Sequence, residues 1–452
     1  MGKLRAGAVT SNITPSLGVS LNGGMSDRAA THIHDDLHAR CLVLDNGKTR
    51  QAYVFGDRWM LDRELMDEAK ARLAKAGVVD ADHVCISATH THTAPTSVGV
   101  FQSDPDEAYR AFLMPRIVDG VIRAANQLEP AKLAWAVGEE PTQVFNRRWY
   151  MKPGTIGVNP FGSDADTVRM NPPRGSQDLI EPAGKTDPAV SVIAATSLEG
   201  RPIGLLANYS LHYVGGTGPG DVSADYFALF ANRMQALLNA DRLDPPFVGM
   251  MTNGTSGDIN NVNFRQESPR VGPYLQMQRV AYLVANAANQ ALQQATWHSD
   301  VELNSRQSLL TLGRRLPSAN EVARAQFVLS QAPKGKQLST REQIYARETV
   351  LMEDWPATIE IVLQAHRIGD VGIATTPCET FVEIGEKIKE FSPFPITFTI
   401  ELANGYAGYL PTAAQHKLGG YETWRARSSF LEEQAADKVE RSLQGMFREL
   451  RP

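Results

Sequence analysis

Apolar segments typical of β-strands alternate along this chain with amphipathic segments typical of helices. In chain order they are strand-like 39–47 and 51–57, helix-like 63–78, strand-like 83–90 and 202–212, helix-like 226–240, and strand-like 245–254. Runs with period two or continuous apolar character predict strands, and apolar residues recurring every three to four positions predict helices. Strand, helix, strand order favours an α/β architecture. We therefore expect an α/β fold with mixed sheets flanked by helices.

Three further segments constrain the organisation of the chain. Residues 141–190 are dense in Gly, Pro and Asn, so we expect an extended loop with little regular structure, and a loop that long usually shapes a site. Residues 318–350 read as a helical hairpin interrupted by Pro333 and Gly335, and residues 428–450 as a closing amphipathic helix.

Composition excludes several functional classes. A formal net charge of −5 and the lack of a clustered Lys/Arg run argue against a nucleic-acid partner. No stretch of about 18 apolar residues predicts a membrane span. No signal-peptide pattern follows Met1, so we expect a cytoplasmic protein, with a periplasmic or secreted location as the alternative if a leader was removed. The sequence predicts a small-molecule partner and does not indicate the oligomeric state.

The segment "ISATHTH" places two histidines, His90 and His92, at the end of an apolar run. Imidazole is the commonest ligand of transition metals in proteins. Because side chains alternate along a strand, an HxH pair in a strand points both rings to the same face, where they can share a cavity. The alternative is a pair of ordinary surface or core histidines.

A second histidine cluster lies in "THIHDDLHAR", which contains His32, His34 and His38. It is close to the HxHxDH signature of metallo-β-lactamase-type enzymes, but Leu37 stands where that signature has its last histidine. We expect this cluster to line the edge of a loop.

Polar groups also follow other predicted strands. His212 ends "GLLANYSLH", and Asp258 follows the strand-like "MMTN" in "MMTNGTSGDINN". Glu379 follows the apolar "VGIA" and precedes an amphipathic helix, so it is either a charge partner of the helix N-terminus or a metal ligand. Ligands in open α/β sheets bind beyond the carboxyl ends of strands, so these positions together indicate a site.

Four widely separated motifs resemble those of the neutral/alkaline (non-lysosomal) ceramidase family, which are zinc amidases. "THTHTAP" resembles the family's "THTHSGP", His212 matches its second strand-end histidine, "PCE" with Glu379 resembles "PGE", and a tyrosine-rich segment carries Tyr409 and the "YE" of Tyr421 and Glu422. The resemblance covers roughly residues 5–425. It implies a fold like the ceramidase N-terminal domain, with residues 1–452 as a single catalytic domain and 428–450 as its closing helix.

The resemblance also implies the roles of individual residues. One Zn²⁺ ion would be bound by His90, His212, Glu379 and Tyr409. His92 would take a proton from water, Tyr421 would donate a hydrogen bond to the developing oxyanion, and Arg147 in "FNRR" would anchor a substrate oxygen.

The chain departs from the family at two places. Ceramide-cleaving members carry "GDVSPN" with a serine at the zinc, whereas this chain has "GDINNV", in which Asp258 is kept and Asn260 replaces the serine. An amide side chain cannot act as a nucleophile. Either zinc-bound water is therefore the only nucleophile, or the reaction differs from that of the ceramide-cleaving members. We also expect a divergent member that lacks the family's immunoglobulin-like C-terminal domain.

These observations predict a zinc-dependent hydrolase that uses zinc-activated water to cleave the amide bond of a small or medium-sized polar N-acyl compound. The polar segment "TVRMNPPRGSQD" in the long loop favours such a substrate over a two-tailed lipid. The alternatives are an esterase, lactonase or lyase on the same scaffold, and a noncatalytic binding homologue.

Overall fold

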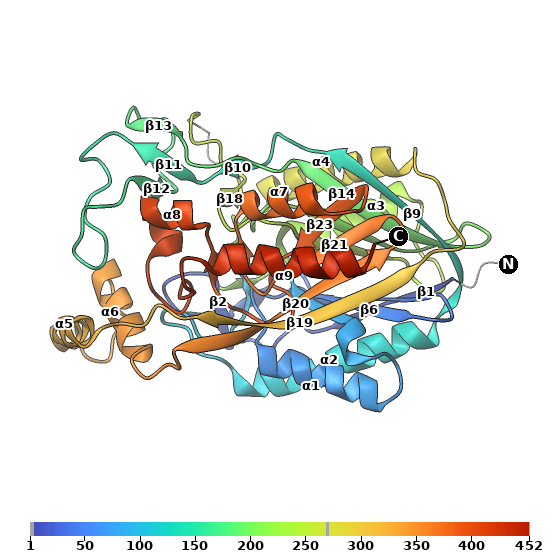
Figure 1. The fold of residues 1–452 in the computed structure, drawn as a ribbon, viewed down its shortest axis with the longest axis horizontal. Coiled ribbons are helices and arrows are strands. Elements are labelled where there is room, and N and C mark those ends of the chain that lie inside the picture. Colours follow the sequence, from blue (N-terminus) through green and yellow to red (C-terminus); the bar gives the residue numbers. More distant parts are fainter. Residues whose placement is uncertain (1–3, 268–270, 452) are drawn as a thin grey trace.

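The structure is a computed structural model that describes residues 4–267 and 271–451 (Figure 1). It contains several sheets and flanking helices, which confirms the α/β fold predicted from the sequence. Within the described residues, none of the helices combines the length and the apolar character that a membrane crossing requires.

The largest sheet has eight strands and mixed pairing. Only the pairs β6–β7 and β15–β17 are parallel. The sheet bends between β1 and β9, where the strands share two residue pairs, and beyond the bend Gly204 lies so close to Ala8 that an added Cβ would come within 3.2 Å of the alanine Cβ. The strand order is β17 (Val248–Asn253), β15 (Pro202–Tyr209), β14 (Ala189–Ser197), β9 (Glu129–Glu139), β1 (Arg5–Asn12), β5 (His38–Asp45), β6 (Arg50–Gly56) and β7 (Val84–Ala88).

A four-stranded sheet packs against both arms of the bent sheet. The three inner faces share one apolar core, to which Tyr53 and Phe55 contribute from β6 and Ile373 and Phe398 from the smaller sheet. Because successive side chains in a strand point to opposite faces, Val54 lies instead in the core under the helices. The order of the smaller sheet is β19 (Leu303–Gly313), β20 (Thr358–Ile368), β21 (Val371–Thr375) and β23 (Ile396–Ile400).

A pair of helices covers the outer face of each sheet section. These pairs are α1 (Arg63–Lys75) with α2 (Glu107–Asn126), α3 (Asp225–Leu237) with α4 (Leu275–Leu292), and α7 (Val382–Phe391) with α9 (Ala435–Glu449). The hairpin predicted at 318–350 is confirmed as α5 (Ala319–Ser330) and α6 (Arg341–Leu351), which project at one end of the molecule (Figure 1). Helix α9 begins at Ala435, later than the predicted 428.

The remaining elements are short, and several fall where the sequence predicted little regular structure. Within 141–190 the chain forms a three-stranded sheet in the order β12–β11–β13, which corrects that expectation. The short elements are β2 (Ser20–Asn22), β3 (Arg28–Ala29), β4 (His32–Ile33), η1 (Ala81–His83), β8 (Ala94–Pro95), β10 (Phe145–Asn146), β11 (Arg148–Met151), β12 (Val168–Met170), β13 (Leu179–Pro182), β16 (Asp221–Val222), β18 (Ile259–Asn260), β22 (Glu379–Thr380), β24 (Tyr409–Leu410), α8 (Ala413–Leu418) and η2 (Tyr421–Thr423).

The carboxyl ends of strands from all three sections meet at one end of the molecule. The backbone after β23 joins them, because the N–H of Glu401 donates to the carbonyl of Asn253 at the end of β17 (3.2 Å) and the carbonyl of Leu402 accepts from Ala88 at the end of β7 (3.2 Å). The loops that leave these strands therefore share one region, as expected for a site at strand ends.

One buried lysine, Lys70, lowers the free energy of unfolding of this protein. Lys70 lies on the inner side of α1 with 3 % of its surface exposed, and its Nζ has no hydrogen-bond partner among the described residues. Burial lowers the pKa of Lys70 to about 8, and nearby Cys85 and Asp67 offset this only in part. At neutral pH the folded protein thus holds a buried, unpaired ammonium group.

We expect Lys70→Met to raise the free energy of unfolding at pH 7 by about 1–3 kcal/mol, since a shift of one pKa unit corresponds to about 1.4 kcal/mol. The native pKa lies below that of the unfolded chain, so the gain should be complete below pH 8 and fade between about pH 8 and 10. Urea unfolding at both ends of this range tests it. Lys75→Met, at an exposed position on the same helix, should change stability by less than about 0.5 kcal/mol.

Candidate metal centre

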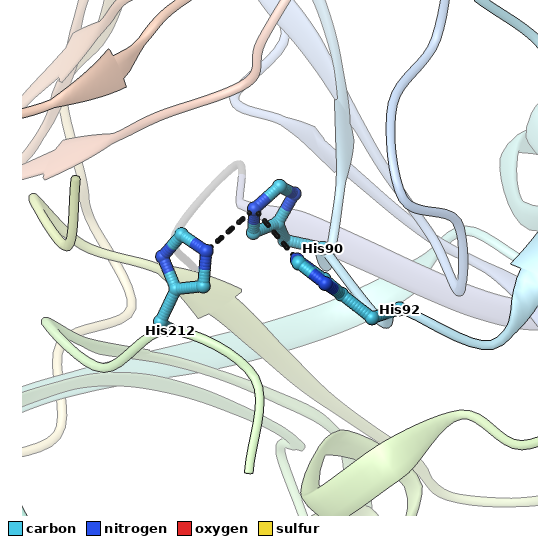
Figure 2. Close-up of side chains that lie close together, drawn as sticks. All are labelled: His90, His92 and His212. Carbon is cyan, nitrogen blue, oxygen red and sulfur yellow. Dashed lines mark hydrogen bonds between the residues drawn. The ribbon is translucent and has the colours of Figure 1, made fainter. Parts of the chain in front are cut away.

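Three imidazole rings converge where the strands end. His90 and His92 lie in the loop after β7, and His212 lies just past β15. The Nε2 atom of His90 is 3.0 Å from His212 Nε2 and 3.3 Å from His92 Nε2 (Figure 2). One potential ligand atom from each ring lies within 4.8 Å of the others. Nitrogens that bind one metal ion at about 2.0–2.1 Å lie at a similar spacing, so the three rings could hold a metal ion.

The reason for this convergence differs from the one given by the sequence. β7 ends at Ala88, so His90 and His92 lie beyond the strand and the alternation of side chains does not apply to them. His90 has φ +73°, in the left-handed region that non-glycine residues seldom adopt. The two rings are perpendicular, with centroids 4.7 Å apart. A strained turn, held by its surroundings, brings them together.

Backbone carbonyls fix which nitrogen of each ring carries the proton. The Nδ1 atom of His90 lies 2.9 Å from the carbonyl oxygen of Trp59. The corresponding distances are 2.7 Å from His92 to Gly23 and 3.1 Å from His212 to Ser256. A carbonyl oxygen only accepts, so each Nδ1 must donate and each Nε2 keeps its lone pair. Hydrogen bonds of this kind orient the histidines of metal sites.

The facing Nε2 atoms could hold a cation between them. The contacts drawn as dashed lines in Figure 2 join two lone pairs unless a ring gains a proton. Burial lowers the pKa of His92 and of His212 well below the usual range, and neighbouring His90 lowers both further. Both rings are therefore neutral at pH 7, and a divalent cation would remove the repulsion.

Glu379 adds a carboxylate to the same point. Its Oε2 lies 3.3 Å from His90 Nε2 and 3.7 Å from His212 Nε2, yet it accepts no hydrogen bond from the described residues. The other oxygen, Oε1, accepts from the hydroxyl of Tyr406 at 2.9 Å. Burial acts to raise the pKa of Glu379, but its contacts with His90 and Tyr409 and the charge of Arg147 together hold it below the ordinary value. A buried, ionised and unpartnered oxygen beside lone pairs fits a metal ion.

A glycine lets the loop after β17 approach Glu379. A Cβ at Gly257 would lie 2.4 Å from the carbonyl oxygen of Glu379, closer than any side chain could come. The N–H of Gly257 instead donates to the carbonyl of Thr380 at 2.9 Å. Gly257 therefore determines how near this loop lies to the carboxylate.

Tyr409 and Arg147 form the next layer. Tyr409 is the register partner of Glu379 in the β22–β24 pair, so the two residues are neighbours. Its hydroxyl accepts from Nη2 of Arg147 at 3.0 Å, and the same Nη2 donates to the carbonyl of Gly257 at 2.8 Å. The sequence-predicted residues His90, His212, Glu379, Tyr409 and Arg147 thus lie in one connected group.

Two buried arginines share one carboxylate behind this group. Arg147 donates from Nε to Glu422 Oε1 at 2.9 Å, and Arg148 donates from Nη1 to Glu422 Oε2 at 2.6 Å. All three side chains are buried. Within this buried trio, one negative charge therefore serves two positive charges.

Tyr421 packs beside this layer. Its ring centroid lies 5.8 Å from that of Tyr409 and 6.2 Å from that of Trp424. Burial raises the pKa of Tyr421, with Glu379 acting in the same direction. The phenol is therefore protonated at neutral pH and able to donate a hydrogen bond.

Asp258 and Asn260 lie beside the centre in different roles. Asp258 accepts from Asn146 Nδ2 at 2.7 Å and from the backbone N–H of Val382, the first residue of α7, at 3.0 Å. Burial raises the pKa of Asp258 to about 6. These bonds support the loop, while Asn260 bonds to the long loop through Asn171 (2.7 Å).

Two residues at the site had not been singled out in the sequence. Trp59 donates its indole N–H to His92 Nε2 at 3.1 Å, and the ring of Tyr213 stacks on His92 with a centroid distance of 3.5 Å. Both follow strand ends, after β6 and β15, so the rule that exposed the histidines would also have nominated them. His32, in β4, and His38, at the start of β5, lie outside the triad, and both are in strands rather than at the edge of a loop.

A cavity of about 410 Å³ opens beside His212, large enough for a small organic ligand. Its lining residues are Arg147, Asn171, Pro172, Pro173, Arg174, His212, Tyr213, Val214, Asn260, Asn261, Val262 and Phe264. The long loop predicted to shape a site contributes the segment 171–174 to this lining.

We expect Glu422→Gln to lower the free energy of unfolding by about 3–5 kcal/mol, because it leaves two buried guanidinium groups without a counter-charge. Urea unfolding measures the loss. Glu342→Gln makes the same chemical change at an exposed ion pair with Arg324 and should cost less than about 1 kcal/mol. Equal effects of the two substitutions would contradict the role given to Glu422.

No protein-family model matches this chain. Among solved structures, the neutral ceramidase from Pseudomonas aeruginosa is similar with a TM-score of 0.73 and 19% identity, over 100% of this chain and 75% of that chain. A ceramidase complexed with C2 gives a TM-score of 0.73 and 18% identity, over 100% of this chain and 76% of that one. Identities this low establish likeness of fold alone. The chain therefore has the fold of the neutral ceramidases, as its four motifs led us to expect.

Proposed function

We propose that this chain is a zinc-dependent hydrolase that cleaves the amide bond of a small or medium-sized polar N-acyl compound. The observation that carries the proposal is the convergence of imidazole lone pairs with the unpartnered Oε2 of Glu379. Mixed nitrogen and oxygen donors suit zinc among the common metals. The motifs that resemble those of a zinc amidase family, on the fold of the ceramidases, support the choice of bond.

We assign the metal ligands to His90, His212, Glu379 and Tyr409. His92 is the third imidazole of the cluster, but its Nε2 already accepts a hydrogen bond from Trp59. A lone pair that is shared in this way is less available to a metal ion. We therefore place His92 beside the ion, where it can exchange the indole N–H for a proton from water.

A zinc ion at this position would supply a Lewis acid and lower the pKa of a coordinated water toward neutrality. His92 accepts the proton of the attacking water at Nε2 and keeps its orientation through the bond from Nδ1 to Gly23. Tyr421 donates its phenolic proton in a hydrogen bond to the substrate oxygen on which negative charge develops. Arg147 holds Tyr409 in place and directs positive charge toward the substrate oxygen.

The lining of the cavity is evidence for a compact polar substrate. Two arginines and three asparagines lie among its lining residues, whereas a lipid pocket would be lined mainly by apolar side chains. Asn260 stands at the position of the family's serine and cannot attack a carbonyl, which supports water as the nucleophile. Asp258 holds the same loop in place through the hydrogen bonds that it accepts from Asn146 and from the backbone N–H of Val382.

A screen of short N-acyl compounds, esters and lactones with zinc-loaded protein tests the reaction. We propose that N-acyl compounds are the best substrates and that the acid product takes up ¹⁸O from labelled water. Preferred turnover of esters or lactones would replace the amidase proposal, and product without the label would indicate a lyase. Zinc binding without turnover of any of these compounds would favour a binding protein.

We expect His90→Ala to lose both the bound metal and activity, because it removes the imidazole nearest to the other proposed ligands. Metal analysis by mass spectrometry after dialysis against Zn²⁺ should give one equivalent for the unmodified protein and little for the variant. His32→Ala, an exposed histidine outside the cluster, should retain the metal. A His90→Ala variant that keeps one tightly bound zinc would contradict the assignment.

Tyr421→Phe should keep the zinc and lower kcat by about 10²–10³, the usual loss for one donor to an oxyanion. The substitution removes only the hydroxyl, so the aromatic packing with Tyr409 and Trp424 remains. Tyr282→Phe on the exposed side of α4 serves as the control and should leave kcat unchanged. Full activity of Tyr421→Phe would show that the phenol does not stabilise the transition state.

A further inference from the structure

The cavity beside His212 presents hydrogen-bond donors and positive charge. Among the described residues that line it there is no aspartate or glutamate, while Arg147, Arg174 and three asparagines are present. A wall of this composition favours an anionic oxygen ligand, because arginine and amide N–H groups donate to oxyanions in charge-assisted bonds.

The hydrogen bonds of the cavity wall determine which atoms of the asparagine side chains remain free to bond to a ligand. The backbone N–H of Val262 donates to Asn260 Oδ1 at 2.9 Å, so that atom must be the oxygen. Asn260 Nδ2 then donates to Asn171 Oδ1 at 2.7 Å. Both side-chain oxygens are occupied in this chain of bonds. One N–H of Asn260 and the Nδ2 group of Asn171 are left to donate.

Arg174 supplies the charge that the ligand can neutralise. Its side chain is exposed and makes no ion pair with any described residue, in contrast to Arg147, which is bonded to Glu422. The two prolines before it limit the backbone. The N–H of Gly175 after it donates to the carbonyl of Phe264 at 2.9 Å. A fixed backbone thus presents a guanidinium group at the wall of the cavity.

We propose that the substrate carries a carboxylate on the part that occupies this cavity, bound by Arg174 together with the amide N–H groups of Asn171 and Asn260. The proposal rests on the function proposed above and names its substrate class: N-acyl compounds with a carboxylate, such as N-acyl amino acids. A single unpaired guanidinium matches a monoanion, and its planar fork matches the two oxygens of a carboxylate. A phosphate dianion would call for more positive charge than this wall provides.

The test compares substrates that differ only in this group: an N-acyl amino acid, its neutral carboxamide and an N-acyl aminoalkyl phosphate. We expect kcat/KM for the acid to exceed that for the carboxamide by about 10–100-fold, mostly through KM. Equal kcat/KM for the acid and the carboxamide would overturn the proposed binding of a carboxylate. It would not contradict the hydrolase proposal. Preference for the phosphate would likewise overturn the proposed binding of a carboxylate.

Two substitutions test whether the preference for the acid over the carboxamide depends on the residues that line the cavity. Arg174→Gln should lower kcat/KM for the acid by about 10–100-fold and leave the carboxamide unchanged. Asn260→Asp keeps an acceptor for the N–H of Val262 but places negative charge toward the ligand, so it should act in the same direction. Arg448→Gln, an exposed arginine on α9, is the control and should change neither substrate. Loss on both substrates alike in Arg174→Gln would overturn the proposal.

Calorimetry separates failure of this inference from failure of the proposed function. If no N-acyl compound is turned over, zinc-loaded protein is titrated with the N-acyl amino acid itself. Binding that weakens at least tenfold in Arg174→Gln and is absent for the carboxamide supports the carboxylate site even though the hydrolase proposal fails. Absence of binding to the unmodified protein overturns both.

Discussion

The site depends on the repulsion between imidazole lone pairs that point at one another. The backbone carbonyls of Trp59, Gly23 and Ser256 each accept a hydrogen bond from the Nδ1–H of one ring. The Nε2 atoms therefore face each other without a hydrogen between them. Burial keeps His92 and His212 neutral, and a cation bound between the rings would remove the conflict. The carbonyls lie in three loops far apart in sequence. The packing of the bent large sheet against the smaller sheet is therefore needed to orient the rings, because it brings their strand ends together.

The positive charge behind the site follows from how the arginines are paired. Glu422 accepts hydrogen bonds from both arginines. Arg147 also donates to the hydroxyl of Tyr409 and to the carbonyl of Gly257. Burial makes this arrangement costly to break, since water cannot replace the missing counter-charge. The same arginine reaches the wall of the cavity. The candidate metal centre and the cavity are therefore linked through one guanidinium group.

Sequence patterns predicted the fold better than the geometry of the site. Long apolar and amphipathic runs such as 51–57 and 63–78 fall within one to three residues of their elements, since many residues report the same period. Strands of two to four residues within 141–190 carry too little period to be recognised. No local pattern encodes the proximity of His90, His212 and Glu379; their places after strands indicated a shared site, and only the family resemblance made them ligands of one ion. The turn at His90 was missed because its φ reflects tertiary contacts.

The two halves of the site differ in what builds them. Strand ends of the large core supply the groups of the candidate metal centre, whereas most of the cavity wall comes from the long loop and from the segment after Gly257. A short strand pair joins the halves: Asn146 opposes Ile259 in β10–β18, and the side chain of Asn146 also bonds to Asp258. Loops on a rigid scaffold can change while the scaffold keeps its geometry. The side chain at position 260, which lies at this joint, can thus alter what the cavity binds without moving the histidines.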